Sequence, residues 1–229
     1  MSAPFPSLPE KLDPRHTALV VIDVQNDFCH PNGHSRKRAG IVSEAHAAMR
    51  TNLVPLLDAA RQADALRVFV RITNYPKYLS APAAERLDKI GFLGKCLLEG
   101  SWGADYWEEI RPLPDNPREL EVVKHRYSAF WGTNLDQLLR SQGIQTLVFA
   151  GLATSGCVES TARDGLMADY FVMLAADCCA DDAESHRNTL RKFERSFGEV
   201  LTAQQVIEMW GSAPAKAPYS RSAARQAGA

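Results

Sequence analysis

Apolar residues along this chain gather in short unbroken runs that are separated by longer amphipathic segments. The clearest run is Thr17–Ile22, which stops at one acidic residue, Asp23. A run without polar alternation is typical of a parallel strand that is buried on both faces. Similar runs predict further strands at 65–72, 121–123, 145–151, 170–175 and 199–202.

The segments between these runs have helical periodicity. They predict helices at 43–63, 133–142, 156–168 and 181–196. Pro55 predicts a kink or a break in the first helix, because proline removes an intrahelical hydrogen bond, and Thr133 is a favourable cap for the second. Strands that alternate with helices indicate an α/β fold with three layers, α/β/α. The sheet of such a fold is doubly wound, mainly parallel and Rossmann-like, and here it has about six strands.

Three segments interrupt this alternation. Residues 1–15 hold four prolines and are predicted to form an N-terminal surface arm, and residues 214–229, rich in Ala, Ser and Arg, to form a loosely held tail. The remaining residues, 16–213, then form a single domain. Within it, residues 73–120 carry five prolines and are too long for a simple connection, so we expect them to build a substrate pocket or an oligomer contact.

Composition and charge narrow the class of protein. The 229 residues are 45% hydrophobic, which suits one globular domain with a sizeable core, and the net charge of −1 gives no reason to expect nucleic acid or an anionic membrane as a partner. No apolar run reaches the roughly 18 residues of a membrane span, and the N-terminus does not resemble a signal peptide. Five irregularly spaced cysteines favour a reducing compartment, so we expect a cytoplasmic protein. Trp102, Trp107 and Trp131, together with the insertion, favour a homo-oligomer.

Reactive residues follow three of the predicted strands. Ligands of open α/β sheets bind beyond the carboxyl ends of the strands. Asp23 ends the first strand, Lys124 follows the third, and Cys157 opens the helix after the fourth. In the common strand order 3-2-1-4, Lys124 would stand about 10 Å from the first strand, so its side chain would have to lean inward.

Each of these residues has a chemical and a structural interpretation. A thiol at a helix start is favoured as thiolate, although Cys157 could also pack as a small buried hydrophobe. Asp23 could carry a proton or cap the following turn. Lys124 could stabilise the thiolate and orient Asp23, or be a solvated lysine at a strand end. The three residues together favour a catalytic role over the structural interpretations.

Phe28, Asn74 and Tyr127 follow the first three strands and are candidates for substrate contact. Their structural alternatives are core packing for Phe28, turn chemistry for Asn74 and rim packing for Tyr127. The segment 29–34 holds a cysteine and two histidines, but no second cluster completes a set of metal ligands. We therefore expect neither a metal nor a cofactor. The adjacent Cys178 and Cys179 are interpreted as core residues.

Three segments together resemble the isochorismatase-like cysteine hydrolases, over about residues 17–197. They are TALVVIDVQNDFCHPNG, VVKHRYSAFWGTNLDQLLRSQGIQTLVFAG and LATSGCVESTARDGLMADYFVMLAADCCADD. The resemblance implies that Asp23, Lys124 and Cys157 form a catalytic triad. It also implies a cis peptide between Leu152 and Ala153, with the N–H groups of Ala153 and Cys157 forming an oxyanion hole.

Two departures refine the resemblance. Isochorismatases typically lack the cysteine that is present here as Cys157, and nicotinamidases carry a metal-binding Asp-x-His after strand two, which residues 71–76 lack. The ureidoacrylate, biuret and triuret amidohydrolases are more similar. We therefore expect an amidohydrolase that cleaves a C–N bond of a small amide or ureide through a thioester or thiocarbamate. The alternatives are a maleamate- or nicotinamide-type amidase and a non-catalytic α/β binding module.

Overall fold

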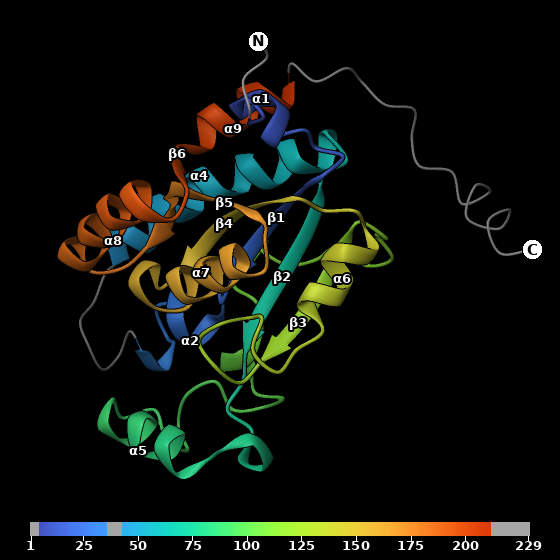
Figure 1. Ribbon diagram of the computed structural model, residues 1–229. Helices are drawn as coiled ribbons and strands as arrows, with labels where there is room; N and C mark the ends of the chain where they lie inside the picture. The colour runs from blue at the N-terminus through green and yellow to red at the C-terminus, as the bar shows by residue number, and fades with distance from the viewer. Residues whose placement is uncertain (1–4, 36–42, 212–229) are drawn as a thin grey trace, which may run out of the picture.

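A computed structural model describes residues 5–35 and 43–211, and in these ranges it has one sheet of six parallel strands (Figure 1). The strands are β1 (Thr17–Ile22), β2 (Leu66–Ile72), β3 (Glu119–Lys124), β4 (Thr146–Leu152), β5 (Phe171–Ala180) and β6 (Glu199–Leu201). Their order is β3-β2-β1-β4-β5-β6, and every pairing is parallel. The predicted doubly wound α/β fold is confirmed.

Helices cover both faces of this sheet. They are α4 (Ser43–Gln62) and α9 (Ala203–Gly211) on one face, and α6 (Leu135–Ser141), α7 (Glu159–Met167) and α8 (Ala183–Ser196) on the other. Side chains alternate along the central strands, so that Val21 packs in the α4 cluster and Val20 in the α6–α8 cluster. Both are buried, which explains why the run in β1 is continuously apolar.

Some predicted elements differ from the observed ones. Helix α4 continues through Pro55 without a break, because Leu53, Leu56 and Leu57 on both sides of the proline are fully buried in the core. Helix α9 was not predicted. Strand β5 runs on to Ala180 rather than stopping at residue 175, with an irregular register against β4.

The N-terminal residues dock on the domain. After α1 (Leu8–Lys11), Leu12 is only 1% exposed, and its carbonyl accepts a hydrogen bond from Trp210 Nε1 at 3.1 Å. Trp107 is also buried, whereas Trp102 and Trp131 are exposed. The predicted tail, 214–229, lies outside the described residues. Among the residues described, no helix combines the length and apolar character that crossing a membrane requires.

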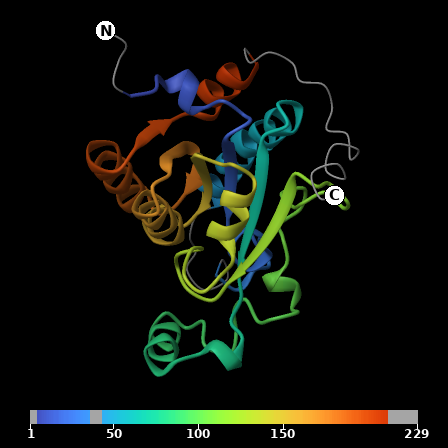
Figure 2. The ribbon, with the colours of Figure 1, turned by 45° about the vertical axis from the view of Figure 1, so that its right-hand side comes forward.

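The part of the insertion 73–120 around helix α5 (Ala81–Lys89) forms a lobe beyond the carboxyl ends of the strands, whereas Trp107 and Ile110, later in the insertion, pack in the core with α4. Helix α5 projects away from the sheet, as Figures 1 and 2 show. Two short 3-10 turns, Pro76–Tyr78 and Trp102–Ala104, flank the helix in sequence. None of the residues of α5 is buried, so the lobe needs other anchors to hold its position.

Polar side chains just after β1, around helix α2 (Asn26–Cys29), provide these anchors. Gln25 Nε2 donates to the carbonyls of Ile72 and Ala104, at 3.0 and 2.7 Å. The Asn26 amide donates to the Trp102 carbonyl at 2.9 Å, and Asp27 accepts from the Leu97 N–H at 2.6 Å. The Val-Gln-Asn-Asp-Phe motif therefore fixes the insertion against the end of β1.

Candidate active site

Asp23 and Lys124 form a buried ion pair at the carboxyl edge of the sheet. Lys124 Nζ lies 2.7 Å from Asp23 Oδ2, and neither side chain is exposed. Asp23 leaves β1 with a positive φ of 54°, and its N–H donates to the Val70 carbonyl of β2 at 2.9 Å. The strand order places β2 between the two residues, so the long lysine side chain crosses the end of β2 at Ile72, its register partner. The inward lean that the sequence required is observed.

Cys157 lies on the other side of Asp23, in the π-helical turn Thr154–Val158 that follows β4. Gly151 determines how closely β4 approaches β1, because its φ is +111° and a Cβ there would lie 2.0 Å from the Ile22 carbonyl oxygen. Only glycine fits such a site. The peptide bond between Leu152 and Ala153 is cis, as the resemblance implied.

The Cys157 side chain interacts with both members of the pair. It is 8% exposed and within hydrogen-bonding reach of the Asp23 carboxylate and the Lys124 ammonium group. Thr161 Oγ1 donates to the Cys157 carbonyl at 2.7 Å and accepts from the Ala129 N–H at 3.1 Å. This threonine joins the helix that carries the cysteine to the loop that follows Lys124, so the three candidate catalytic residues belong to one packed unit.

Burial dominates the electrostatics of this cluster. It raises the pKa of the Asp23 carboxyl, although Lys124 partly opposes the shift. Burial, followed by the charge of Asp23, raises the pKa of the Cys157 thiol to about 12. Burial opposes protonation of Lys124, but Asp23 and Cys157 outweigh it and raise the pKa of the lysine, which keeps its charge. The expectation that the helix start favours a thiolate is therefore wrong for the resting protein.

This protonation state predicts how Cys157 responds to alkylation. Because burial raises the pKa of this thiol to about 12, very little of it is ionised at pH 7, and only the thiolate is nucleophilic. The iodoacetamide rate at Cys157 should rise about tenfold per pH unit from pH 7 to pH 10, as followed by peptide mass spectrometry. A rate that is high and flat from pH 6 upward would contradict the raised pKa.

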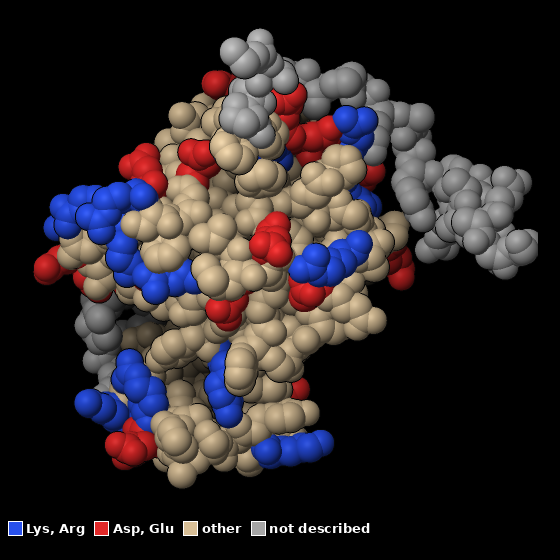
Figure 3. Space-filling model, viewed as in Figure 1, with Lys and Arg blue, Asp and Glu red and all other residues tan. Residues whose placement is uncertain are grey.

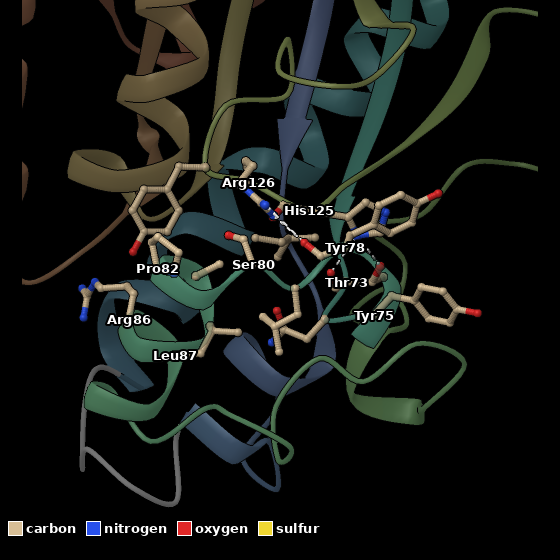
Figure 4. Close-up of a pocket in the computed structure, with 14 residues that line it drawn as sticks. Thr73, Tyr75, Tyr78, Ser80, Pro82, Arg86, Leu87, His125 and Arg126 are labelled. Carbon is tan, nitrogen blue, oxygen red and sulfur yellow. Dashed lines mark hydrogen bonds between the residues drawn. The ribbon is translucent and has the colours of Figure 1, made fainter.

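A cavity of about 340 Å³ opens at the ends of β2 and β3, beneath α5 (Figure 4). Asn74 and Tyr127, two of the predicted substrate-binding residues, are among its lining residues. Phe28 is not, and its ring instead packs near Phe92, with centroids 6.2 Å apart. None of the three candidate catalytic residues lines the cavity. The link to them is Lys124 Nζ, which donates to the Arg126 carbonyl at 3.1 Å.

Asn74 also has a structural task. Its side-chain amide donates to the Cys96 carbonyl and its backbone N–H to the Leu97 carbonyl, both at 2.8 Å. These bonds tie the beginning of the insertion to its middle. Tyr127, in contrast, is 47% exposed, so its hydroxyphenyl group is available to a bound molecule.

Four residues with a role at this edge were not predicted. His125 stacks on Tyr78 with ring centroids 4.1 Å apart, and the side chain of Arg126 reaches the same tyrosine's carbonyl. Gln25 and Asp27 anchor the insertion. All four stand inside the motifs that surround Asp23 and Lys124, and this proximity in sequence is the signal that could have identified them.

The side chains of segment 29–34 serve packing. The His30 ring contacts Trp102 edge-on, with centroids 4.9 Å apart, and His34 Nε2 lies 3.0 Å from the Gly91 carbonyl. Within the described residues, no group of three His, Cys, Asp or Glu side chains is arranged to hold a metal ion.

Comparison with known proteins identifies the family. The family model described as the isochorismatase domain matches residues 17–205. The chain belongs to the isochorismatase family. Among curated relatives, the ureidoacrylate amidohydrolase RutB of Pantoea ananatis (strain LMG 20103) is 32% identical over 212 residues, which cover 86% of this chain and 83% of the relative.

Solved structures of isochorismatase-family and related hydrolases agree. A cysteine hydrolase from Pseudomonas syringae pv. phaseolicola 1448A is 27% identical and superposes with a TM-score of 0.78, covering 93% of this chain and 99% of that one. The N-carbamoylsarcosine amidase from Thermoplasma acidophilum is 28% identical, with a TM-score of 0.67 and coverage of 82% and 96%. The predicted assignment to the amidohydrolase branch is confirmed, and the chain is an enzyme of the amidohydrolase class.

Proposed function

We propose that this isochorismatase-family enzyme cleaves a C–N bond of a small amide or ureide, with Cys157 as nucleophile, Asp23 as proton carrier and Lys124 as the fixed positive charge. The observation that carries this proposal is the buried Asp23–Lys124 pair, 2.7 Å apart, in contact with the one thiol at the end of β4. Burying two charges is costly, and what sets this pair apart from the buried Arg67–Glu119 pair is its contact with a thiol at the carboxyl edge of the sheet, where ligands of such folds bind.

Acylation is the first half of the reaction. The resting thiol is protonated, so its proton moves to Asp23 as the sulfur attacks the carbonyl carbon, and the raised pKa of Asp23 makes it a stronger base than an ordinary carboxylate. Lys124 stabilises the negative charge while the proton moves. The carbonyl C–N bond then breaks, Asp23 gives its proton to the leaving nitrogen, and a thioester or thiocarbamate remains on Cys157.

Deacylation returns the enzyme to its starting state. Asp23 takes a proton from water, which attacks the acyl carbon, and the C–S bond breaks. The product is a carboxylic or carbamic acid, and the thiol regains the proton. In both halves the N–H groups of Ala153, just before the π-helical turn, and of Cys157, within it, are the proposed oxyanion donors. Each donor in comparable sites is worth about 3–4 kcal/mol.

Relatives favour a ureide as substrate. RutB is named for ureidoacrylate and the Thermoplasma enzyme for N-carbamoylsarcosine, both of which carry a carbamoyl group on nitrogen. The test is an ammonia-release screen of the purified chain over ureides, carbamoyl amino acids, maleamate and nicotinamide. Ureides and carbamoyl compounds should be hydrolysed fastest. A clear preference for maleamate or nicotinamide would favour the other amidase types, and turnover of none of them would favour a binding module.

Chelators should leave turnover unchanged. The residues that follow β2 are Thr73, Asn74 and Tyr75, which offer no Asp-x-His pair to a metal, and the proposed chemistry uses only protein groups. Activity should therefore survive exhaustive dialysis against EDTA or phenanthroline. If added zinc restored an activity that the chelator had removed, the metal-free mechanism would be wrong.

A further inference from the structure

The cavity beneath α5 is basic. Its lining includes Arg86, Arg126 and His125 but no aspartate or glutamate. The remaining wall is largely apolar and aromatic, with Tyr78, Leu79, Pro82 and Leu87 among its residues. Figure 3 shows basic side chains on both sides of the hollow between the α5 lobe and the main body. A cavity of this size and character suits a small molecule with a short hydrocarbon body and a negative charge.

Arg126 is held in place without being neutralised. Its Nη1 donates to the carbonyls of His125 and Tyr78, at 2.7 and 3.2 Å, and its Nη2 donates to the Tyr78 carbonyl at 3.2 Å. These partners are backbone oxygens, and no carboxylate among the described residues pairs with this arginine. A guanidinium group has five N–H donors in a planar fork, so donors remain for a bound carboxylate.

Arg126 is also tied to the candidate catalytic residues. Its own carbonyl accepts the hydrogen bond from Lys124 Nζ at 3.1 Å. The backbone of Arg126 is therefore fixed to the ion pair, and the same residue lines the cavity.

Arg86 faces the cavity from the opposite side. Figure 4 shows Arg126 on the side of the sheet and Arg86 on α5, toward the outside. Arg86 is exposed, so it contributes mainly a longer-range attraction that salt screens. Lys89 stands one helical turn further along the same exposed helix but does not line the cavity.

We infer that this cavity selects substrates that carry a carboxylate, with Arg126 as the residue that binds it and Arg86 as a weaker contributor at the rim. The inference rests on the proposed function and refines it: the substrate is an anionic ureide whose carboxylate lies under α5 while its carbamoyl group lies at Cys157.

The experiment compares two ureas that differ only in their terminal group. 3-Ureidopropionate and propylurea have chains of equal length and the same type of leaving nitrogen, but only the first bears a carboxylate. The quantity measured is the ratio of their kcat/KM values, for wild type and for Arg126→Gln, Arg126→Lys, Arg86→Gln and Lys89→Gln. Titration calorimetry of both ureas, with each variant combined with Cys157→Ser to stop turnover, gives the same comparison for binding alone.

Wild type should prefer 3-ureidopropionate. Arg126→Gln should lower the ratio by roughly 10- to 100-fold, the usual value of a charge-assisted hydrogen bond. Arg126→Lys should recover part of it, because it restores the charge but not the fork. Arg86→Gln should lower the kcat/KM ratio by about two- to fivefold, and this effect should weaken as salt is added. Lys89→Gln is the matched control for the loss of a positive charge and should leave the ratio unchanged.

Three outcomes overturn the inference. The first is an unchanged kcat/KM ratio in Arg126→Gln. The second is an equal loss of kcat/KM on both ureas in Arg126→Gln, which would make Arg126 only a clamp for Tyr78. The third is a fall of the ratio in Lys89→Gln as large as that in Arg86→Gln. If neither urea is hydrolysed, the proposed function fails separately. Calorimetry still decides the inference in that case, because wild type must bind 3-ureidopropionate more tightly than propylurea, and Arg126→Gln must remove the difference.

Discussion

Replacing Cys157 with serine should lower turnover by roughly 10³-fold or more while the protein stays folded. Serine is nearly isosteric with cysteine, but its hydroxyl is a far weaker nucleophile in a site whose only base is a carboxylate. The loss should fall on kcat, because the site, α7 and the cavity beneath α5 keep their shape. Turnover by ammonia release and the melting temperature measure the two effects. Residual activity above about a tenth of wild type would rule out the covalent role.

Cys179→Ser is the matched control. Cys179 is also buried, its pKa is likewise raised to about 12 by burial, and its Sγ lies 3.7 Å from the Phe149 carbonyl, which a serine hydroxyl can use as acceptor. This variant should retain turnover. Wild type quenched with acid during turnover should carry the acyl mass on the peptide that contains Cys157. An acyl mass elsewhere would assign the nucleophile to another residue.

Asp23→Asn should cut turnover by roughly 10²–10⁴, the usual effect of losing a general acid–base group. It should also destabilise the fold, because removing one partner of a buried ion pair lowers the free energy of unfolding by about 3–5 kcal/mol. A hydrogen bond from Lys124 to the carbonyl of the new asparagine side chain should recover part of this loss. Glu119→Gln separates these effects. Glu119 is also a buried carboxylate, paired with Arg61 at 2.9 Å and Arg67 at 3.2 Å, at the other end of β3. This control should be destabilised similarly but turn over normally.

The pH profile gives an independent measurement of the same role. Folding raises the pKa of Asp23, and its protonated form cannot accept the thiol proton. Wild-type kcat/KM should therefore decrease as the pH is lowered. The midpoint of this decrease should lie above pH 3.8, the ordinary pKa of an aspartate carboxyl. Asp23→Asn should lose this acid limb. Near-normal turnover with an unchanged limb in this variant would leave Asp23 as a structural cap only.

The central strands could be predicted because both of their faces are covered. Strand β1 begins and ends where its apolar run does, since every residue in it is buried. Strand β5 could not be followed to its end, because it contains Asp177. The side-chain carboxylate of Asp177 accepts a hydrogen bond from the Ala203 N–H at 2.7 Å. The backbone carbonyl of Asp177 accepts one from the Asn52 side-chain amide at 3.1 Å. These partners are distant in sequence and supply the stability that the local pattern lacks.

The candidate catalytic residues could also be predicted, and the strand order implied an inward lean of Lys124, but neither its contact with Asp23 nor the ionisation of the three residues could be. The positions of Asp23, Lys124 and Cys157 at strand ends indicated a common edge. That a lysine two strands away reaches the aspartate depends on the length of its side chain and on how β2 ends. The raised pKa of Cys157 depends on burial, which a helix-start argument does not contain.

The anchors of the insertion have an evolutionary consequence. Gln25, Asn26 and Asp27 bind the main-chain carbonyl and N–H groups of the insertion at Leu97, Trp102 and Ala104. Main-chain groups are present whatever the side chain, so most residues of the lobe can mutate without undocking it. Gly103 is an exception, because a Cβ there would lie 2.2 Å from the Asp27 carboxylate. Substrate preference can thus diversify by point mutation in the lobe while the reaction chemistry is inherited unchanged.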